Sequence, residues 1–273
     1  MTATKIWGDL IDQSNKDVLA WIKLYLRIAI AVCFIGHGMW GLVFKPGWLP
    51  FFHLFGIPDN IAWPLIFLVG LKDIICGIWI IYSDSKYLLY WIIFWAIFVA
   101  LLRPFLGMGM EGFIERAGNY GPPIAMLYFL TYIWKKELSK QLLNQHIGKL
   151  EWILRISLFL LLLGHGGVAN MLTQNADYKV LVQNLETFGL PTTYAFMTTL
   201  AVFEVCLSFI VLFWPRIQGL MWFVLIFKIL SESMYPFTFG AYSIFETIER
   251  FGDYMIPLLL MVIYRNWTKE ELA

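Results

Sequence analysis

Charged residues are scarce in this chain. Asp, Glu, Lys and Arg make up 14% of the 273 residues, whereas hydrophobic residues make up 60% and aromatic residues 18%. A soluble domain covers its surface with polar groups, and this composition does not supply them. The net charge of +1 provides no basic surface for nucleic acid. The composition therefore indicates a protein of the lipid bilayer.

Cysteines and catalytic motifs are also sparse. The three cysteines, Cys33, Cys76 and Cys206, lie in apolar runs and form no Cys-x-x-Cys pair, which argues against a dithiol redox centre. The chain has no phosphate-binding glycine loop, dinucleotide fingerprint, Gly-x-Ser-x-Gly elbow or His-Glu-x-x-His motif. These absences exclude several enzyme classes, and the sequence predicts no metal site.

The alternating ten-residue pattern of a membrane β-barrel is missing as well, so the remaining way to satisfy backbone groups in lipid is the α-helix. The sequence predicts an all-α, polytopic membrane protein with about eight transmembrane helices. Apolar runs that approach the length needed to cross about 30 Å of hydrocarbon occur at 19–43, 61–82, 88–106, 122–134, 150–171, 194–214, 217–235 and 254–267. The fourth and eighth runs are short, which permits a tilted or interrupted helix there.

The distribution of Lys and Arg predicts the orientation of these helices. The polar segment 1–17 lacks the pattern of a cleaved signal peptide. Basic residues are more frequent in the loops on the side of the termini, so we expect both termini in the cytoplasm. That side carries Lys5, Lys16, Lys86, Lys135, Lys136, Lys140, Lys149, Arg216, Arg265 and Lys269, and the other side carries Lys45, Arg116, Lys179 and Arg250.

The chain contains an internal repeat. The segment Ile-Glu-Arg-Ala-Gly-Asn-Tyr-Gly-Pro-Pro at 114–123 returns as Ile-Glu-Arg-Phe-Gly-Asp-Tyr-Met-Ile-Pro at 248–257. Gly-His-Gly at 36–38 returns at 164–166, and Phe-Gly-Ile-Pro at 55–58 returns as Phe-Gly-Leu-Pro at 188–191. The pattern predicts two four-helix repeats, parallel because each has an even number of crossings. The expected layout is a polar N-terminus at 1–18, repeats at 19–134 and 150–267, a cytoplasmic linker at 135–149 and a tail at 268–273.

Two groups of polar side chains are expected toward the extracytoplasmic half of the bilayer. The first comprises His37, Glu115, Arg116, Asn119 and Tyr120, and the second comprises His165, Glu249, Arg250, Asp253 and Tyr254. Polar groups in a dry environment are paired or bind a ligand, so both groups are ligand-binding candidates. The alternative is structural, because the Gly, Asn/Asp and Pro positions are also suited to turning the chain and starting a helix.

Charges deeper in the predicted spans suggest ion pairs. Arg27 and Asp73 lie at matching depth in the first two helices, and Arg155 and Glu204 stand in the same relation in the second repeat. We therefore expect the structural pairs Arg27 with Asp73 and Arg155 with Glu204.

The two repeats differ in one helix. Aligning Pro104 with Pro236 sets Lys228 against Ala96 and Glu232 against Ala100. Lys228 and Glu232 are one helical turn apart and can pair. If only one repeat carries an active pocket, this difference favours the C-terminal one. The alternative is that the pair is structural and joins the two halves.

The equivalent His37 and His165 invite a haem interpretation. No second histidine lies at helical spacing on either helix, so ordinary hydrogen-bonded histidines are favoured over bis-histidine haem.

Each repeat resembles the DoxX family of four-helix bacterial membrane proteins. The resemblance rests on an Arg early in the first helix, the Gly-rich outer end Gly36-His37-Gly38, the Phe-Gly-Ile-Pro loop, and the acidic residues Asp73 and Glu204 in the second helix of each repeat. In duplicated form the chain is similar to the membrane subunit of a thiosulfate:quinone oxidoreductase. The resemblance implies a bacterial inner membrane and a periplasmic or membrane redox partner. It also implies that the polar outer half holds a quinone head group as cofactor, or binds a small sulfur-containing or other periplasmic substrate. The chain departs from the family at His37 and His165, and at Asp73, where Glu is more usual.

Three functions are open on this sequence. As the membrane subunit of a quinone-linked redox system, the protein would use His165, Arg250 and Tyr254 to hold the quinone, and Lys228, Glu232 and Glu204 as a proton or charge path. As a transporter of a small anion, it would use Arg116 and Arg250 for recognition. As a non-catalytic scaffold, it would assemble periplasmic partners.

Overall fold

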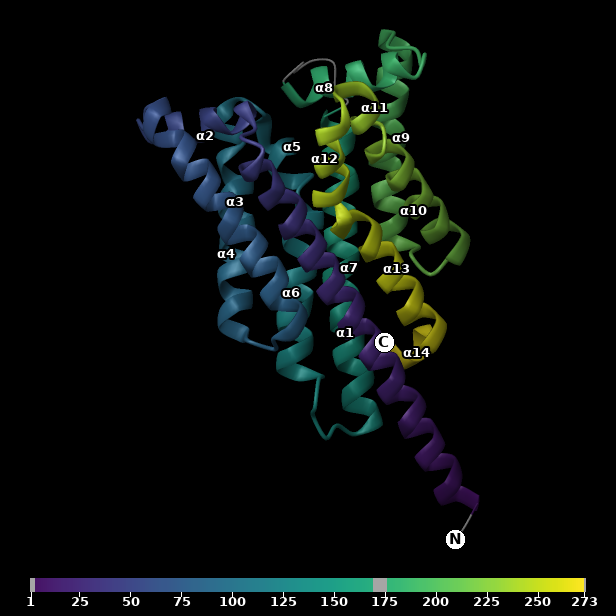
Figure 1. Ribbon diagram of the computed structural model, residues 1–273. Helices are drawn as coiled ribbons and strands as arrows, with labels where there is room; N and C mark the ends of the chain where they lie inside the picture. The colour runs from purple at the N-terminus through teal and green to yellow at the C-terminus, as the bar shows by residue number, and fades with distance from the viewer. Residues whose placement is uncertain (1–2, 169–175, 273) are drawn as a thin grey trace.

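The computed structural model describes residues 3–168 and 176–272, and every regular element in that part of the chain is helical (Figure 1). The predicted all-α class is confirmed. Eight long helices overlap the predicted spans, most of which extend one to four residues beyond a helix end: α1 (Ala3–Leu42), α3 (Asp59–Tyr82), α4 (Lys86–Leu102), α6 (Ala117–Tyr132), α7 (Lys140–Val168), α9 (Tyr194–Phe213), α10 (Gln218–Glu232) and α13 (Phe251–Asn266). Residues 169–171 of the fifth predicted span lie outside the described residues.

Shorter helices connect the long ones, mostly at the end of the molecule where α2, α8, α11 and α12 gather in Figure 1. They are η1 (Pro46–Trp48), α2 (Leu49–His53), η2 (Pro104–Leu106), α5 (Gly109–Ile114), α8 (Ala176–Thr187), α11 (Tyr235–Phe239), η3 (Ala241–Ser243), α12 (Ile244–Glu249) and α14 (Lys269–Leu272).

Several helices are long and apolar enough to cross a bilayer, as expected of a multi-pass membrane protein. In the described residues these are Asp17–Leu42, Asp59–Tyr82, Lys86–Leu106, Tyr194–Phe213 and Gln218–Phe239. Helices α6 and α13 have 16 residues each, or about 24 Å of helix, which is short of the hydrocarbon thickness. That α6, α7 and α13 also cross the membrane stays a prediction.

The repeated Phe-Gly-x-Pro blocks make the same local structure twice. Gly56 and Gly189 both have positive φ, near +69° and +68°, a conformation that favours glycine. Each lies shortly before a long helix, α3 or α9. The repeated sequence therefore ends one segment and sets the direction of the next helix.

The centre of the molecule consists of α1, α6, α7 and α13, with α3 and α4 on one side and α9 and α10 on the other (Figure 1). Helix α1 packs closely on α3, where Gly38 and Gly41 lie against Gly70. It also packs on α12 and α13, where Gly36 lies against the backbone of Ile248.

Helix α7 has the corresponding neighbours. It packs on α9 and, through Gly164, on the backbone of Glu115 at the end of α5. The first long helix of each predicted repeat thus contacts the last helices of the other, so neither half is a separate bundle.

The repeated Ile-Glu-Arg segments break a helix in two. The first lies between α5 and α6, which are separated at Glu115 and Arg116, and the second lies at Arg250, between α12 and α13. Just after the breaks, the equivalent Gly118 and Gly252 face each other so closely that a Cβ on Gly252 would overlap the Gly118 carbonyl. The two breaks therefore lie side by side in the centre of the molecule.

This contact predicts a measurable cost for a single methyl group. Gly252→Ala should lower the free energy of unfolding in detergent by about 1–3 kcal/mol, because the added Cβ displaces backbone. Gly219→Ala is the matched control, since nothing lies within 4 Å of its Cβ position, and it should be neutral or stabilising because alanine favours the helix. Equal stability of the two variants would disprove the close approach of α6 and α13.

Candidate functional site

The breaks between α5 and α6 and between α12 and α13 bring buried charges from both halves of the chain together. Arg116 Nη1 donates to Glu249 Oε1 at 2.8 Å, and Arg116 Nε lies 3.2 Å from Glu115 Oε1. All three side chains are buried. Arg116 therefore joins the first half of the chain to the second.

Arg250 continues this network on the other side. Its guanidinium lies 2.8 Å from Glu232 Oε2, 2.8 Å from Glu246 Oε2 and 3.9 Å from Glu249 Oε1. Glu246 also pairs with Lys45, which follows α1. Charged residues from both polar groups expected from the sequence, Glu115 and Arg116 from the first and Glu249 and Arg250 from the second, therefore belong to one network. The sequence analysis listed the two groups separately, because a repeat does not reveal whether its copies pack on each other.

Arg103, at the end of α4, extends the network on the first half. Its Nη1 lies 3.5 Å from Glu115 Oε1 and 3.4 Å from Asp177 Oδ2.

Lys228, on α10, is the most deeply buried cation of the site, with no exposed side-chain surface. Its Nζ donates to Glu232 Oε1 at 2.6 Å and lies 2.9 Å from His165 Nε2 and 3.7 Å from Asp253 Oδ2. An ammonium group has no acceptor, so His165 Nε2 accepts this hydrogen bond. The predicted pairing of Lys228 with Glu232 is confirmed.

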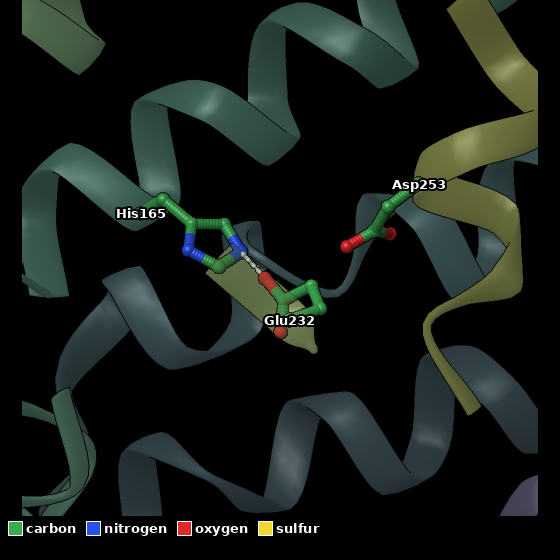
Figure 2. Close-up of side chains that lie close together, drawn as sticks. All are labelled: His165, Glu232 and Asp253. Carbon is green, nitrogen blue, oxygen red and sulfur yellow. Dashed lines mark ion pairs between the residues drawn. The ribbon is translucent and has the colours of Figure 1, made fainter. Parts of the chain in front are cut away.

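Figure 2 shows His165, Glu232 and Asp253 directed toward one another. Their ligand atoms lie within 4.8 Å of each other, as in a metal site. However, Lys228 Nζ contacts all three side chains, and its charge serves where a metal ion would be needed. The resident cation of this cluster is therefore a lysine.

His37 is held differently from its counterpart His165. Its Nδ1 lies 2.8 Å from Oδ2 of the fully buried Asp73, so the ring donates through Nδ1. Lys72 Nζ lies 3.0 Å from the other oxygen of Asp73 and 3.1 Å from the centroid of the Trp95 ring. The role of Lys72 was not predicted, although a lysine within an apolar run is a signal that the sequence contains.

Neither of the two predicted structural ion pairs forms. Arg27 pairs with Asp84 at 2.5 Å, together with Lys23 at 2.7 Å, and Asp73 pairs with His37 and Lys72 instead. Asp84 lies between two membrane-length helices; burial raises its pKa, but the hydrogen bond from Lys23 and the two cations more than offset this and lower it. The Arg27 side chain reaches toward the helix end, which matching depth alone does not reveal.

The second expected pair, Arg155 with Glu204, is also replaced by other contacts. Arg155 lies 3.5 Å from Glu151 and donates to the carbonyl of Leu212, and Arg216 contacts the other oxygen of Glu151 at 3.3 Å. Glu204 is buried on α9.

The repeated tyrosines have structural partners. The Tyr120 hydroxyl donates to the Phe113 carbonyl at 3.5 Å, and the Tyr254 hydroxyl donates to the Thr247 carbonyl at 3.1 Å. Each bond spans a helix break and links its two sides. Both tyrosines therefore support the helix breaks, and the ligand binding expected of them stays a prediction.

A cavity of about 540 Å³ opens beside the charge network. Aromatic side chains are the largest single group on its walls, aliphatic side chains line another part, and charged side chains and His37 line its polar part. The aromatic set is Trp40, Trp48, Phe51, Phe52, Phe55, Trp95, Phe98, Tyr235 and Phe239, and the ionisable set is His37, Lys45, Arg103, Arg116, Asp177, Glu246, Glu249 and Arg250.

The cavity lies mainly against α1, α2 and α4, on the side of the N-terminal repeat. Residues of the second half, from α8, α11 and α12, line the rest of it. The expectation that a single active pocket belongs to the C-terminal repeat stays a prediction. That expectation rested on the charged side chains Lys228 and Glu232. Both are buried, and neither lines this cavity.

A smaller chamber of about 40 Å³ adjoins the cavity. Both volumes are lined by His37, Trp95, Val99, Arg103, Arg116 and Glu249, and the chamber also reaches Ala96, Ala100 and Asn119. The arrangement can hold a ring against aromatic walls with a polar substituent turned inward.

Comparison of the chain with protein-family models, with curated proteins and with solved structures gives no match.

The buried lysine should carry much of the stability of the site. Lys228→Met leaves Glu232 and Asp253 without their shared cation, so the free energy of unfolding should fall by about 3–5 kcal/mol. Lys140→Met is the matched control, because Lys140 also pairs with a carboxylate, at 3.1 Å from Glu271, but is 72% exposed. Its effect should stay below about 1 kcal/mol. Denaturant titration in detergent measures both, and equal effects would show that the Lys228 pairing is not needed.

Proposed function

We propose that the protein is an integral membrane subunit of a quinone-linked redox system and that the large cavity holds the quinone head group. The observation that carries the proposal is the combination of aromatic walls with hydrogen-bonding groups of Arg103, Arg116 and His37 in one cavity. A flat ring packs on aromatic side chains, and its oxygen atoms require hydrogen-bond donors.

The charge balance of the cavity favours a neutral ligand over an anion. Each lining cation has a carboxylate partner: Glu246 for Lys45, Asp177 for Arg103, and Glu249 for Arg116. Arg250 is paired with Glu232 and Glu246. An anion would have to displace these carboxylates, whereas a neutral ring needs only the remaining N–H groups. This argues against the anion transporter.

His37 is the side chain best suited to exchange a proton with such a ligand. Asp73 fixes the ring through Nδ1, which leaves Nε2 as the nitrogen available to the ligand. A bound quinone would supply the electron chemistry, and the protein would position its oxygen atoms and exclude water from them.

The same proposal covers the membrane arrangement. We infer eight crossings as two parallel repeats, both termini in the cytoplasm, and a DoxX-like relationship in a bacterial inner membrane. The repeated helix breaks and repeated glycine turns support the duplication, and the loop charges support the orientation. Electrons would come from a periplasmic or membrane redox partner.

The proposal predicts a bound quinone. Protein purified in mild detergent from its native membrane should yield close to one quinone per chain on extraction, and a soluble short-chain quinone should quench its tryptophan fluorescence. Trp95→Ala removes a wall of the cavity and should weaken that binding about tenfold, or about 1.4 kcal/mol.

Trp214→Ala is the control, because Trp214 is 63% exposed and does not line the cavity. It should leave binding unchanged. Absence of quinone from the extract, together with no saturable binding of the soluble quinone, would contradict the proposed function.

A further inference from the structure

Equivalent positions in the two halves are filled differently: side chains fill the space beside His165, whereas a small chamber lies beside His37. In the predicted repeat, His37 corresponds to His165, Ala96 to Lys228 and Ala100 to Glu232. In the second half, Lys228 Nζ bridges His165 Nε2 and Glu232 Oε1 at 2.9 and 2.6 Å. In the second half, Lys228 and Glu232 therefore fill the space beside His165.

The first half leaves the corresponding space empty. Ala96 and Ala100 end at Cβ, and the chamber of about 40 Å³ lies between them, His37 and Asn119. The chamber adjoins the large cavity through shared lining residues, among them Trp95 and Arg116. A ligand in the large cavity can therefore extend a substituent into the place that Lys228 fills in the second half.

The residues around the two sites match different occupants. Asp253, which lies 3.7 Å from the Lys228 ammonium, corresponds to Asn119 in the chamber. A carboxylate suits a cation, whereas a carboxamide both donates to and accepts from a neutral group. Glu232 has no counterpart in the chamber, because Ala100 takes its position. The chamber thus has an amide and a methyl group where the second half has the two carboxylates around Lys228. The charged side chains that also line the chamber are paired, Arg116 with Glu249 and Arg103 with Glu115, which leaves room for a neutral polar substituent.

We propose that the chamber beside His37 is the specificity pocket of the ligand site. It takes a small oxygen substituent, a carbonyl, hydroxyl or methoxy group, of a neutral ring that lies in the large cavity. Its volume admits a few atoms and excludes a second ring. His37 Nε2 and the Asn119 amide contact the substituent, and the second half remains closed by Lys228 and Glu232. This inference rests on the proposed function. It adds which residues recognise the substituent of the ligand and why one ligand binds per chain.

The inference is tested by closing the chamber in the way the second half is closed. The double variant Ala96→Lys/Ala100→Glu adds one positive and one negative charge at the positions of Lys228 and Glu232. It should bind a soluble methoxy-substituted benzoquinone at least tenfold more weakly than the wild type in a fluorescence-quenching titration. Because buried charges can prevent folding, Ala100→Leu fills the chamber with apolar atoms alone and should give the same loss.

Ala195→Leu is the matched control, because Ala195 is exposed on α9, and it should bind as the wild type does. Binding is compared only among variants whose thermal stability and elution volume in detergent match those of the wild type. Binding by the wild type together with unchanged binding by Ala100→Leu overturns the specificity pocket and leaves the proposed function intact. No saturable binding by the wild type overturns both.

Discussion

The buried ion pair between Arg116 and Glu249 is the interaction on which the rest of the site depends. Its partners come from opposite halves of the chain, and both lie where a helix is broken. An unpaired charge in an apolar interior costs several kcal/mol, so each break is stabilised by the charge that the other supplies. The exchange of packing partners between α1 and α7, and the contact of Gly118 with Gly252, bring the two breaks within reach of each other.

The same requirement explains the chemistry of the cavity. Every cation that the structure describes on its walls is matched by a carboxylate, which offsets its charge and keeps guanidinium and ammonium groups among the lining residues. Aromatic and aliphatic side chains form most of the remaining walls. A cavity of this kind is polar without being charged, and this distinguishes the site of a neutral ring from the site of an anion.

The sequence predicted the helices well and their partners poorly. Apolar length placed the eight predicted spans on helices, and repetition identified His37, His165, Arg116 and Arg250 as residues to examine. Depth along a helix did not predict the partner of Arg27, because a long side chain reaches several ångströms along the helix to Asp84. The union of the two polar groups was not predictable either, since a repeated sequence does not reveal whether each copy packs on itself. Tyr120 and Tyr254 are repeated because each bridges a helix break.

A double-mutant cycle on Arg116 and Glu249 tests the central claim most directly. The variants Arg116→Met, Glu249→Leu and their combination are compared with the wild type by denaturant titration in detergent. The account predicts a coupling energy of about 2 kcal/mol or more, because each single variant leaves a buried charge without its partner from the other half. Additivity of the two changes within about 0.5 kcal/mol would contradict the claim that this pair joins the halves and neutralises the cavity.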